Sequence, residues 1–210
     1  MTADDPRREP MSAREDRDAL EPLRPILRWI RYAPDRLLHP GRRRRARRTL
    51  AGSPPPRRVV FLCLGNICRS PYAAAVFRRE LPSSWAERIQ VESAGFYPVP
   101  DRPSPAQAIR AARRRGVDLT DHHSQVVSEL RAGPGLLVVG MTADQARRAR
   151  DSWGLAPEQT LVLGDLDPER VERRTIPDPW GRPEAAFDAA YERIDRCVRE
   201  MVGAMFARSG

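Results

Sequence analysis

Short uncharged runs alternate with helical periodicity from about residue 57 to the C-terminus. Four short runs at residues 59–63, 89–93, 136–141 and 160–163 indicate strands, and the first and third are uncharged, as is typical of buried strands. The segments of helical periodicity between and after them lie at 71–80, 105–116, 124–130, 143–151 and from 183 onward. This alternation predicts an α/β fold, a four-stranded parallel sheet flanked by helices on both faces in a Rossmann-like arrangement.

Residues 1–56 follow a different pattern. Residues 1–20 are charged and almost without large apolar groups, which predicts disorder. An amphipathic pattern over 23–33 indicates a short helix that Pro34 should end. Arginines crowd residues 42–48 before a proline spacer. We therefore expect a basic, largely disordered extension over 1–56 and one folded domain over 57–208.

Charge distinguishes these two parts of the chain. Residues 1–56 hold fourteen arginines and eight acidic residues, which gives them +6 of the net charge of +9. Such an arm suits an anionic membrane surface, nucleic acid or an acidic protein, or is simply a solvated tail. Without a membrane-spanning run, an apolar signal core or a disulfide framework, the sequence predicts a cytoplasmic protein, peripheral to the membrane at most through the arm.

The first strand leads into a loop whose residue types suit a tight turn followed by the start of a helix. Gly65 and Asn66 suit a tight left-handed turn, and Ser70 followed by Pro71 is typical of a helix N-cap and first helical position. A strand, a tight loop and a helix start direct backbone N–H groups and the helix dipole at one point. This geometry predicts a phosphate-binding site.

Two side chains in this loop carry the candidate chemistry. Cys63 lies at the end of the strand, where the same field favours a thiolate. Arg69 offers a planar fork that can bind two phosphate oxygens. A nucleotide-binding P-loop is excluded because the chain contains no lysine.

The run Cys-Leu-Gly-Asn-Ile-Cys-Arg-Ser-Pro at residues 63–71 resembles the signature of low molecular weight protein tyrosine phosphatases, and the likeness extends from about residue 58 to the C-terminus. The resemblance implies hydrolysis of phosphotyrosine in proteins through a phosphocysteine on Cys63, with Arg69 binding phosphate. It implies a general acid and base at Asp178, which precedes Pro179 and Trp180. No metal or cofactor is expected.

The resemblance also implies roles around the loop. Asn66 would be held in a left-handed conformation by Ser70, Ser93 and His122, although the adjacent His123 is an alternative. Cys68 would form a reversible disulfide with Cys63. The predicted substrate- and phosphate-binding residues are Leu64, Gly65, Asn66, Ile67, Cys68, Ser70 and Trp180, with Phe96 or Tyr97 as a second aromatic wall.

Several functions share this scaffold. Ile67 stands where related phosphoarginine phosphatases carry Thr, which favours phosphotyrosine. Arsenate reductases relay a disulfide through further thiols, and no cysteine lies between Cys68 and Cys197. A non-catalytic polyanion-binding protein acting through the arginine-rich arm is the alternative from another class. The family resemblance suggests a bacterial tyrosine kinase among the candidate partners.

Overall fold

A computed structural model of the chain describes residues 24–207 and contains one sheet of four parallel strands. The strands are β1 (Arg58–Cys63), β2 (Gln90–Gly95), β3 (Leu136–Gly140) and β4 (Thr160–Val162), in the order β2-β1-β3-β4. The predicted α/β fold and its four strands are confirmed. The first strand lies inside the sheet, so the loop that follows it opens at the C-terminal edge, where ligands of such sheets bind.

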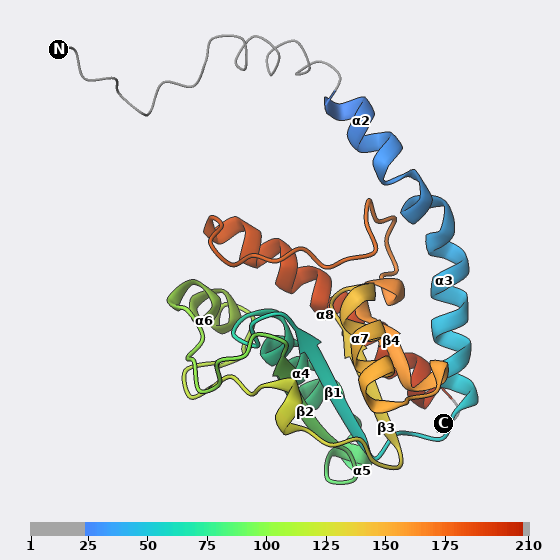
Figure 1. The fold of residues 1–210 in the computed structure, drawn as a ribbon, viewed down its shortest axis with the longest axis vertical. Coiled ribbons are helices and arrows are strands. Elements are labelled where there is room, and N and C mark those ends of the chain that lie inside the picture. The colour runs from blue at the N-terminus through green and yellow to red at the C-terminus, as the bar shows by residue number, and fades with distance from the viewer. Residues whose placement is uncertain (1–23, 208–210) are drawn as a thin grey trace, which may run out of the picture.

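Helices cover both faces of the sheet, as predicted (Figure 1). Alternate residues of β1 supply the two cores, because successive side chains of a strand point to opposite faces. Phe61 packs in the larger cluster with α4 (Arg69–Glu80), α6 (Ala106–Arg113) and α8 (Glu184–Phe206). Leu62 packs in the smaller cluster, beneath α7 (Ala143–Trp153). The short elements are α5 (Ser83–Ala86), η2 (Val127–Glu129), η3 (Pro157–Gln159) and η4 (Leu163–Leu166).

The helix predicted over residues 124–130 is wrong. Only the single turn η2 forms there. The residues before it run beside the end of β2, where Gln125 O accepts the Gly95 N–H and Val126 bridges Gly95. Backbone groups that a helix would have used internally are bonded to the sheet edge instead.

The expectation of a largely disordered extension is wrong for residues 33–52. After α2 (Arg24–Arg31), the long helix α3 (Ala33–Gly52) packs along α8, while α2 extends beyond the sheet and its covering helices (Figure 1). Pro34 stands at the start of α3, a position that tolerates proline. Leu50 is buried in the larger core. The disorder predicted for residues 1–20 lies outside the described residues.

No helix among residues 24–207 is long and apolar enough to cross a membrane.

Candidate active site

The loop between β1 and α4 surrounds the sulfur of Cys63. The Asn66 N–H and the Ser70 hydroxyl each donate to Cys63 Sγ at 3.1 Å. Gly95 lies against this loop, because a Cβ on it would come within 2.7 Å of Leu64 O and 2.9 Å of Asn66 N. Two donors therefore converge on the sulfur and stabilise negative charge there.

Ser70 does not cap the helix, contrary to the sequence prediction. The helix α4 begins at Arg69, its N-cap position is Cys68, and no side chain bonds its free N–H groups. Ser70 instead lies in the first turn, fully buried, with its hydroxyl directed back at the sulfur.

Asn66 adopts a left-handed conformation with φ 51°. Its side-chain amide donates to Ser70 Oγ at 2.8 Å and to Ser93 Oγ at 2.9 Å. Its side-chain oxygen accepts the Gln125 N–H at 2.8 Å. Because a non-glycine residue at positive φ is strained, these bonds hold the loop in a shape that the backbone alone disfavours.

His122, and not His123, faces the loop. His122 Nε2 donates to Asn66 O at 2.7 Å, whereas the exposed His123 has its Nδ1 2.8 Å from Asp101 Oδ1. Burial lowers the pKa of His122, against the opposing effect of its hydrogen bond to Asn66. The neutral imidazole is therefore the form that the fold favours.

Arg69 is buried with its guanidinium beside Asp178. One terminal nitrogen donates to the Asp178 carboxylate and the other to Ile176 O at 3.1 Å. Its Nε is buried and has no hydrogen-bond partner among the described residues. Arg69 thus retains one N–H donor, at Nε, for an anion. An anion bound to Arg69 would also lie close to the Asp178 carboxylate.

Asp165 and Asp167, the carboxylates that closely follow the fourth strand, lie away from the pocket around Cys63. Asp165 accepts two hydrogen bonds from Arg174, and the fully buried Asp167 is paired with Arg193 and Arg196. Both are committed to ion pairs away from Cys63 and do not line its pocket.

A pocket of about 190 Å³ opens above the loop. Among the predicted residues, Cys63, Leu64, Gly65, Ile67, Cys68, Arg69, Asp178 and Trp180 line it. Tyr97 supplies the second aromatic wall, whereas Phe96 packs against the smaller core with Arg148 over its ring. Asn66 and Ser70 do not line the pocket, and their hydrogen bonds, with those of Ser93 and His122, hold the loop in shape.

Arg102 also lines this pocket, and the sequence analysis missed it. Its guanidinium donates to Gly65 O at 2.5 Å and lies 4.3 Å from the centroid of the Tyr97 ring. No motif spacing links it to the loop. The contact arises because the chain turns at Asp101, which has φ 59°, and returns over the loop.

The three cysteines are free and buried. Burial raises the pKa of both Cys68 and Cys197, so these two groups remain thiols at neutral pH. Among residues 24–207, no group of three or more His, Cys, Asp or Glu side chains is placed to hold a metal ion.

Comparison with known proteins agrees with this geometry. The family described as low molecular weight phosphotyrosine protein phosphatase matches residues 58–208. The chain is 28% identical over 145 residues to the low molecular weight protein-tyrosine-phosphatase Etp of Escherichia coli K12, covering 68% of this chain and 90% of Etp. It is 28% identical over 156 residues to the phosphatase Wzb of Salmonella typhi, covering 73% and 97%.

Solved structures show the same fold. Wzb of Vibrio vulnificus, in complex with benzylphosphonate, superposes with a TM-score of 0.55 at 26% identity, covering 69% of this chain and 95% of Wzb. The YwlE arginine phosphatase of Geobacillus stearothermophilus gives a TM-score of 0.59 at 22% identity, covering 73% and 96%. The chain belongs to the low molecular weight protein tyrosine phosphatase family. It is therefore an enzyme of the cysteine-dependent phosphatase class.

Proposed function

We propose that the protein hydrolyses phosphotyrosine in proteins, with Cys63 as nucleophile, Arg69 as phosphate ligand and Asp178 as general acid and base. One observation carries the proposal. A sulfur that accepts two hydrogen bonds, an arginine with an unpaired buried Nε and a carboxylate lying on that arginine line one pocket. Each is the group that one step of phosphoryl transfer to cysteine requires.

In the first step the Cys63 thiolate attacks phosphorus, and the bond from phosphorus to the tyrosine oxygen breaks. Arg69 Nε and the loop N–H groups hold the equatorial oxygens as their charge changes. The phosphate takes Arg69 over from Asp178. The mechanism requires Asp178 to carry a proton in this complex, and Asp178 donates that proton to the departing phenolate oxygen.

In the second step water attacks the phosphocysteine. The ionised Asp178 takes a proton from that water, and the bond from phosphorus to sulfur breaks. The Ser70 hydroxyl, which is 3.1 Å from Cys63 Sγ, donates to the thiolate as it leaves. The enzyme returns to its starting state with inorganic phosphate as product.

The walls of the pocket favour an aromatic ester. Ile67 presents an apolar side chain at the mouth, and Tyr97 and Trp180 are 45% and 66% exposed beside it, free to pack on a substrate ring. The relatives Etp and Wzb are named protein-tyrosine-phosphatases, whereas YwlE, named an arginine phosphatase, shares only the fold at this identity. A bacterial tyrosine kinase is the candidate protein substrate, in a reducing cytoplasm where Cys63 stays free.

The test compares wild type, Cys63→Ser and Asp178→Ala on a phosphotyrosine peptide, a phosphoarginine peptide and para-nitrophenyl phosphate. We expect Cys63→Ser to abolish turnover and Asp178→Ala to reduce it most on the peptide, whose leaving group needs the proton. Preference for phosphoarginine would reassign the substrate. Undiminished turnover by Cys63→Ser would overturn the enzyme mechanism.

For the arm, we propose contact with an anionic membrane surface. Ile26, Leu27, Trp29 and Ile30 of α2 are 53–63% exposed, and arginines of α3 follow directly. Apolar side chains beside arginines match the interface of an anionic bilayer better than they match nucleic acid, which offers no apolar surface to bury.

Co-sedimentation with vesicles tests this contact. The full chain should sediment with phosphatidylserine-containing vesicles and not with phosphatidylcholine alone. Trp29→Ala with Ile30→Ala should release it, whereas Tyr97→Ala, an exposed aromatic outside the arm, should not. Equal binding by the α2 variant would refute the contact.

A further inference from the structure

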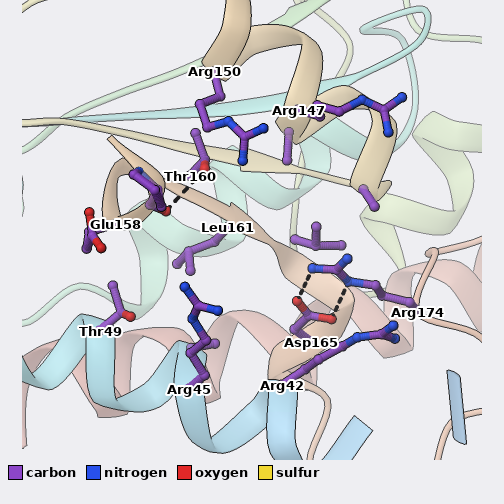
Figure 2. A pocket seen from close by; sticks show the side chains of 15 residues that line it. Arg42, Arg45, Thr49, Arg147, Arg150, Glu158, Thr160, Leu161, Asp165 and Arg174 are labelled. Carbon is purple, nitrogen blue, oxygen red and sulfur yellow. Dashed lines mark hydrogen bonds and ion pairs between the residues drawn. The ribbon is translucent and has the colours of Figure 1, made fainter. Parts of the chain in front are cut away.

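A groove of about 460 Å³ lies between α3, α7 and β4. Figure 2 shows α3 forming one wall and α7 the opposite wall. It shares no residue with the pocket around Cys63. Because α3 precedes the segment matched by the family, the groove exists only where this helix packs on the phosphatase domain.

Guanidinium groups dominate the lining of this groove. Two carboxylates, of Glu158 and Asp165, also line it, and the hydroxyls of Thr49 and Thr160 add polar positions. The guanidinium groups belong to Arg42, Arg45, Arg147, Arg150 and Arg174. Cations gathered from three separate segments in one concave site favour an anion with several charges.

Two of these arginines are fixed in place. Arg174 donates twice to Asp165, at 2.7 and 2.6 Å, and Arg42 donates to Asp35 at 2.7 Å. The pairs are half-buried, so their geometry is set before any ligand arrives. They form a rigid floor at the end of the groove nearest Arg174 (Figure 2).

The remaining three arginines are available to a ligand, because their pairs are exposed or absent among the described residues. Arg147 and Arg150 pair with Asp144 and Asp151 at the surface, and such exposed pairs contribute little. Arg45 has no hydrogen bond or ion pair with any described residue, and Figure 2 shows it pointing from α3 into the groove. A charged donor without a partner, facing a polar cavity, is available to a ligand.

We propose that this groove binds a small multivalent phosphate anion, with Arg45 as its principal ligand and Arg150 opposite. A planar guanidinium binds phosphate oxygens through two parallel hydrogen bonds, and Arg45 and Arg150 belong to different walls. The volume suits a chain of two or three phosphate groups or a phosphorylated metabolite. Binding here does not depend on hydrolysis at Cys63.

The test is calorimetric titration of the full chain with inorganic tripolyphosphate at constant ionic strength. Benzylphosphonate, the ligand in the structure of Wzb from Vibrio vulnificus, is added at saturation to block the pocket around Cys63. We expect one site per chain, weakened about tenfold by Arg45→Ala, since one charge-assisted hydrogen-bond pair is lost. ATP and inorganic phosphate form the second arm and distinguish a nucleotide from a simple phosphate chain.

Arg44→Ala is the matched control. Arg44 is an exposed neighbour on α3 with no partner among the described residues, and it does not line the groove. Unchanged affinity in Arg44→Ala beside the loss in Arg45→Ala supports the site. Equal losses in both variants would indicate general attraction to a basic helix and overturn the proposal, as would the absence of binding.

A separate observation concerns the loop that carries Asp178. The Asp35 carboxylate accepts the Arg174 N–H at 2.9 Å, and His39 Nε2 lies 3.0 Å from Asp167 O. His39 is buried, 7% exposed. Burial opposes ionisation of Asp35, but the hydrogen bonds from Arg174 and Arg42 leave its pKa lowered. An extension helix therefore binds the backbone of the loop just before its acid.

From these contacts we infer that Asp35 and His39 are positioning residues for the general acid, an inference that rests on the proposed role of Asp178. Arg174 and Asp178 are joined by a short stretch, in which Ile176 N donates to Met141 O at 3.1 Å. A loop held at Arg174 and at Ile176 presents Asp178 to the pocket in one orientation.

The test is the dependence of kcat on leaving group across a series of aryl phosphates. Asp35→Ala should lower kcat several-fold on phenyl phosphate and little on para-nitrophenyl phosphate, as a weak form of Asp178→Ala. Glu200→Gln, which removes the α3 pairs of Arg43 and Arg47 without touching the loop, should leave the dependence unchanged.

The outcomes distinguish the positioning role of Asp35 from the proposed acid role of Asp178. A steeper dependence in Asp178→Ala with none in Asp35→Ala would overturn the positioning role alone. No change in Asp178→Ala would overturn the acid assignment itself. The same dependence in Glu200→Gln as in Asp35→Ala would show a general effect of loosening α3 and refute the specific role.

Discussion

At the scale of single residues, the sulfur of Cys63 depends on neutral donors. Its two hydrogen bonds come from the Asn66 N–H and the Ser70 hydroxyl. Within the loop that supplies them, Asn66 has a positive φ. Both donors are uncharged. In the proposed mechanism Arg69 binds the phosphate and stabilises the charge on the transferring group.

Ser70→Ala should slow the second chemical step more than the first. The variant loses the donor to the departing thiolate, worth about 1.5–3 kcal/mol, or roughly 10- to 100-fold in rate. Rapid-mixing measurements with para-nitrophenyl phosphate should show a burst followed by slow turnover. Ser104→Ala is the control, because this buried hydroxyl has no hydrogen-bond partner within residues 24–207. A variant without a burst would contradict this role.

His122 should make the stability of the fold depend on pH. Burial lowers its folded-state pKa below the usual 6.5, so the unfolded chain binds the proton more tightly. This contribution is present above pH 6.5 and is lost as pH falls through the folded-state pKa. Urea titrations between pH 7.5 and 5 should show a decline that His122→Gln removes. The exposed His123→Gln should keep it.

At the scale of elements, α3 is the part that local sequence does not reveal. Its segment combines seven arginines with helix-disfavouring Pro40 and Gly41, and its burial depends on α8, which lies far along the chain. The loop from Cys63 to Ser70 was predictable because a strand, Gly65, Asn66 and a helix start encode it locally. The contacts that Arg102 and Gln125 make with this loop could not be predicted, because both arise where segments distant in the sequence cross.

Leu50→Ala should show that α3 belongs to the folded unit. Leu50 is 5% exposed in the main core, so truncation should lower the free energy of unfolding by about 2–3 kcal/mol. Leu37→Ala, at a side chain 80% exposed on the same helix, should change it by less than about 0.5 kcal/mol. Chemical denaturation measures both. Equal effects would mean that α3 is not docked in solution.

At the scale of the whole molecule, the site is assembled from three regions of sequence. Cys63 ends β1 and Arg69 begins α4. Asp178 belongs to a loop whose backbone is bonded by α3 on one side and by Arg193 of α8 on the other. Arg193 donates to Thr175 O at 2.9 Å and to Arg173 O at 2.8 Å. Asp178, the proposed general acid, therefore belongs to a loop that is bonded to both α3 and the last helix.

The pH profile of turnover tests this assembly as a unit. Catalysis requires ionised Cys63 and protonated Asp178 in one pocket, so kcat/KM should have a mildly acidic optimum and fall toward alkaline pH. In the free enzyme Arg69 donates to the Asp178 carboxylate, and in the proposed mechanism the entering phosphate takes over this guanidinium. Asp178→Asn should lower kcat/KM and remove the alkaline decline, whereas Asp144→Asn, at an exposed carboxylate of α7, should preserve it. A wild-type plateau extending through pH 9 would mean that Asp178 is not the proton donor.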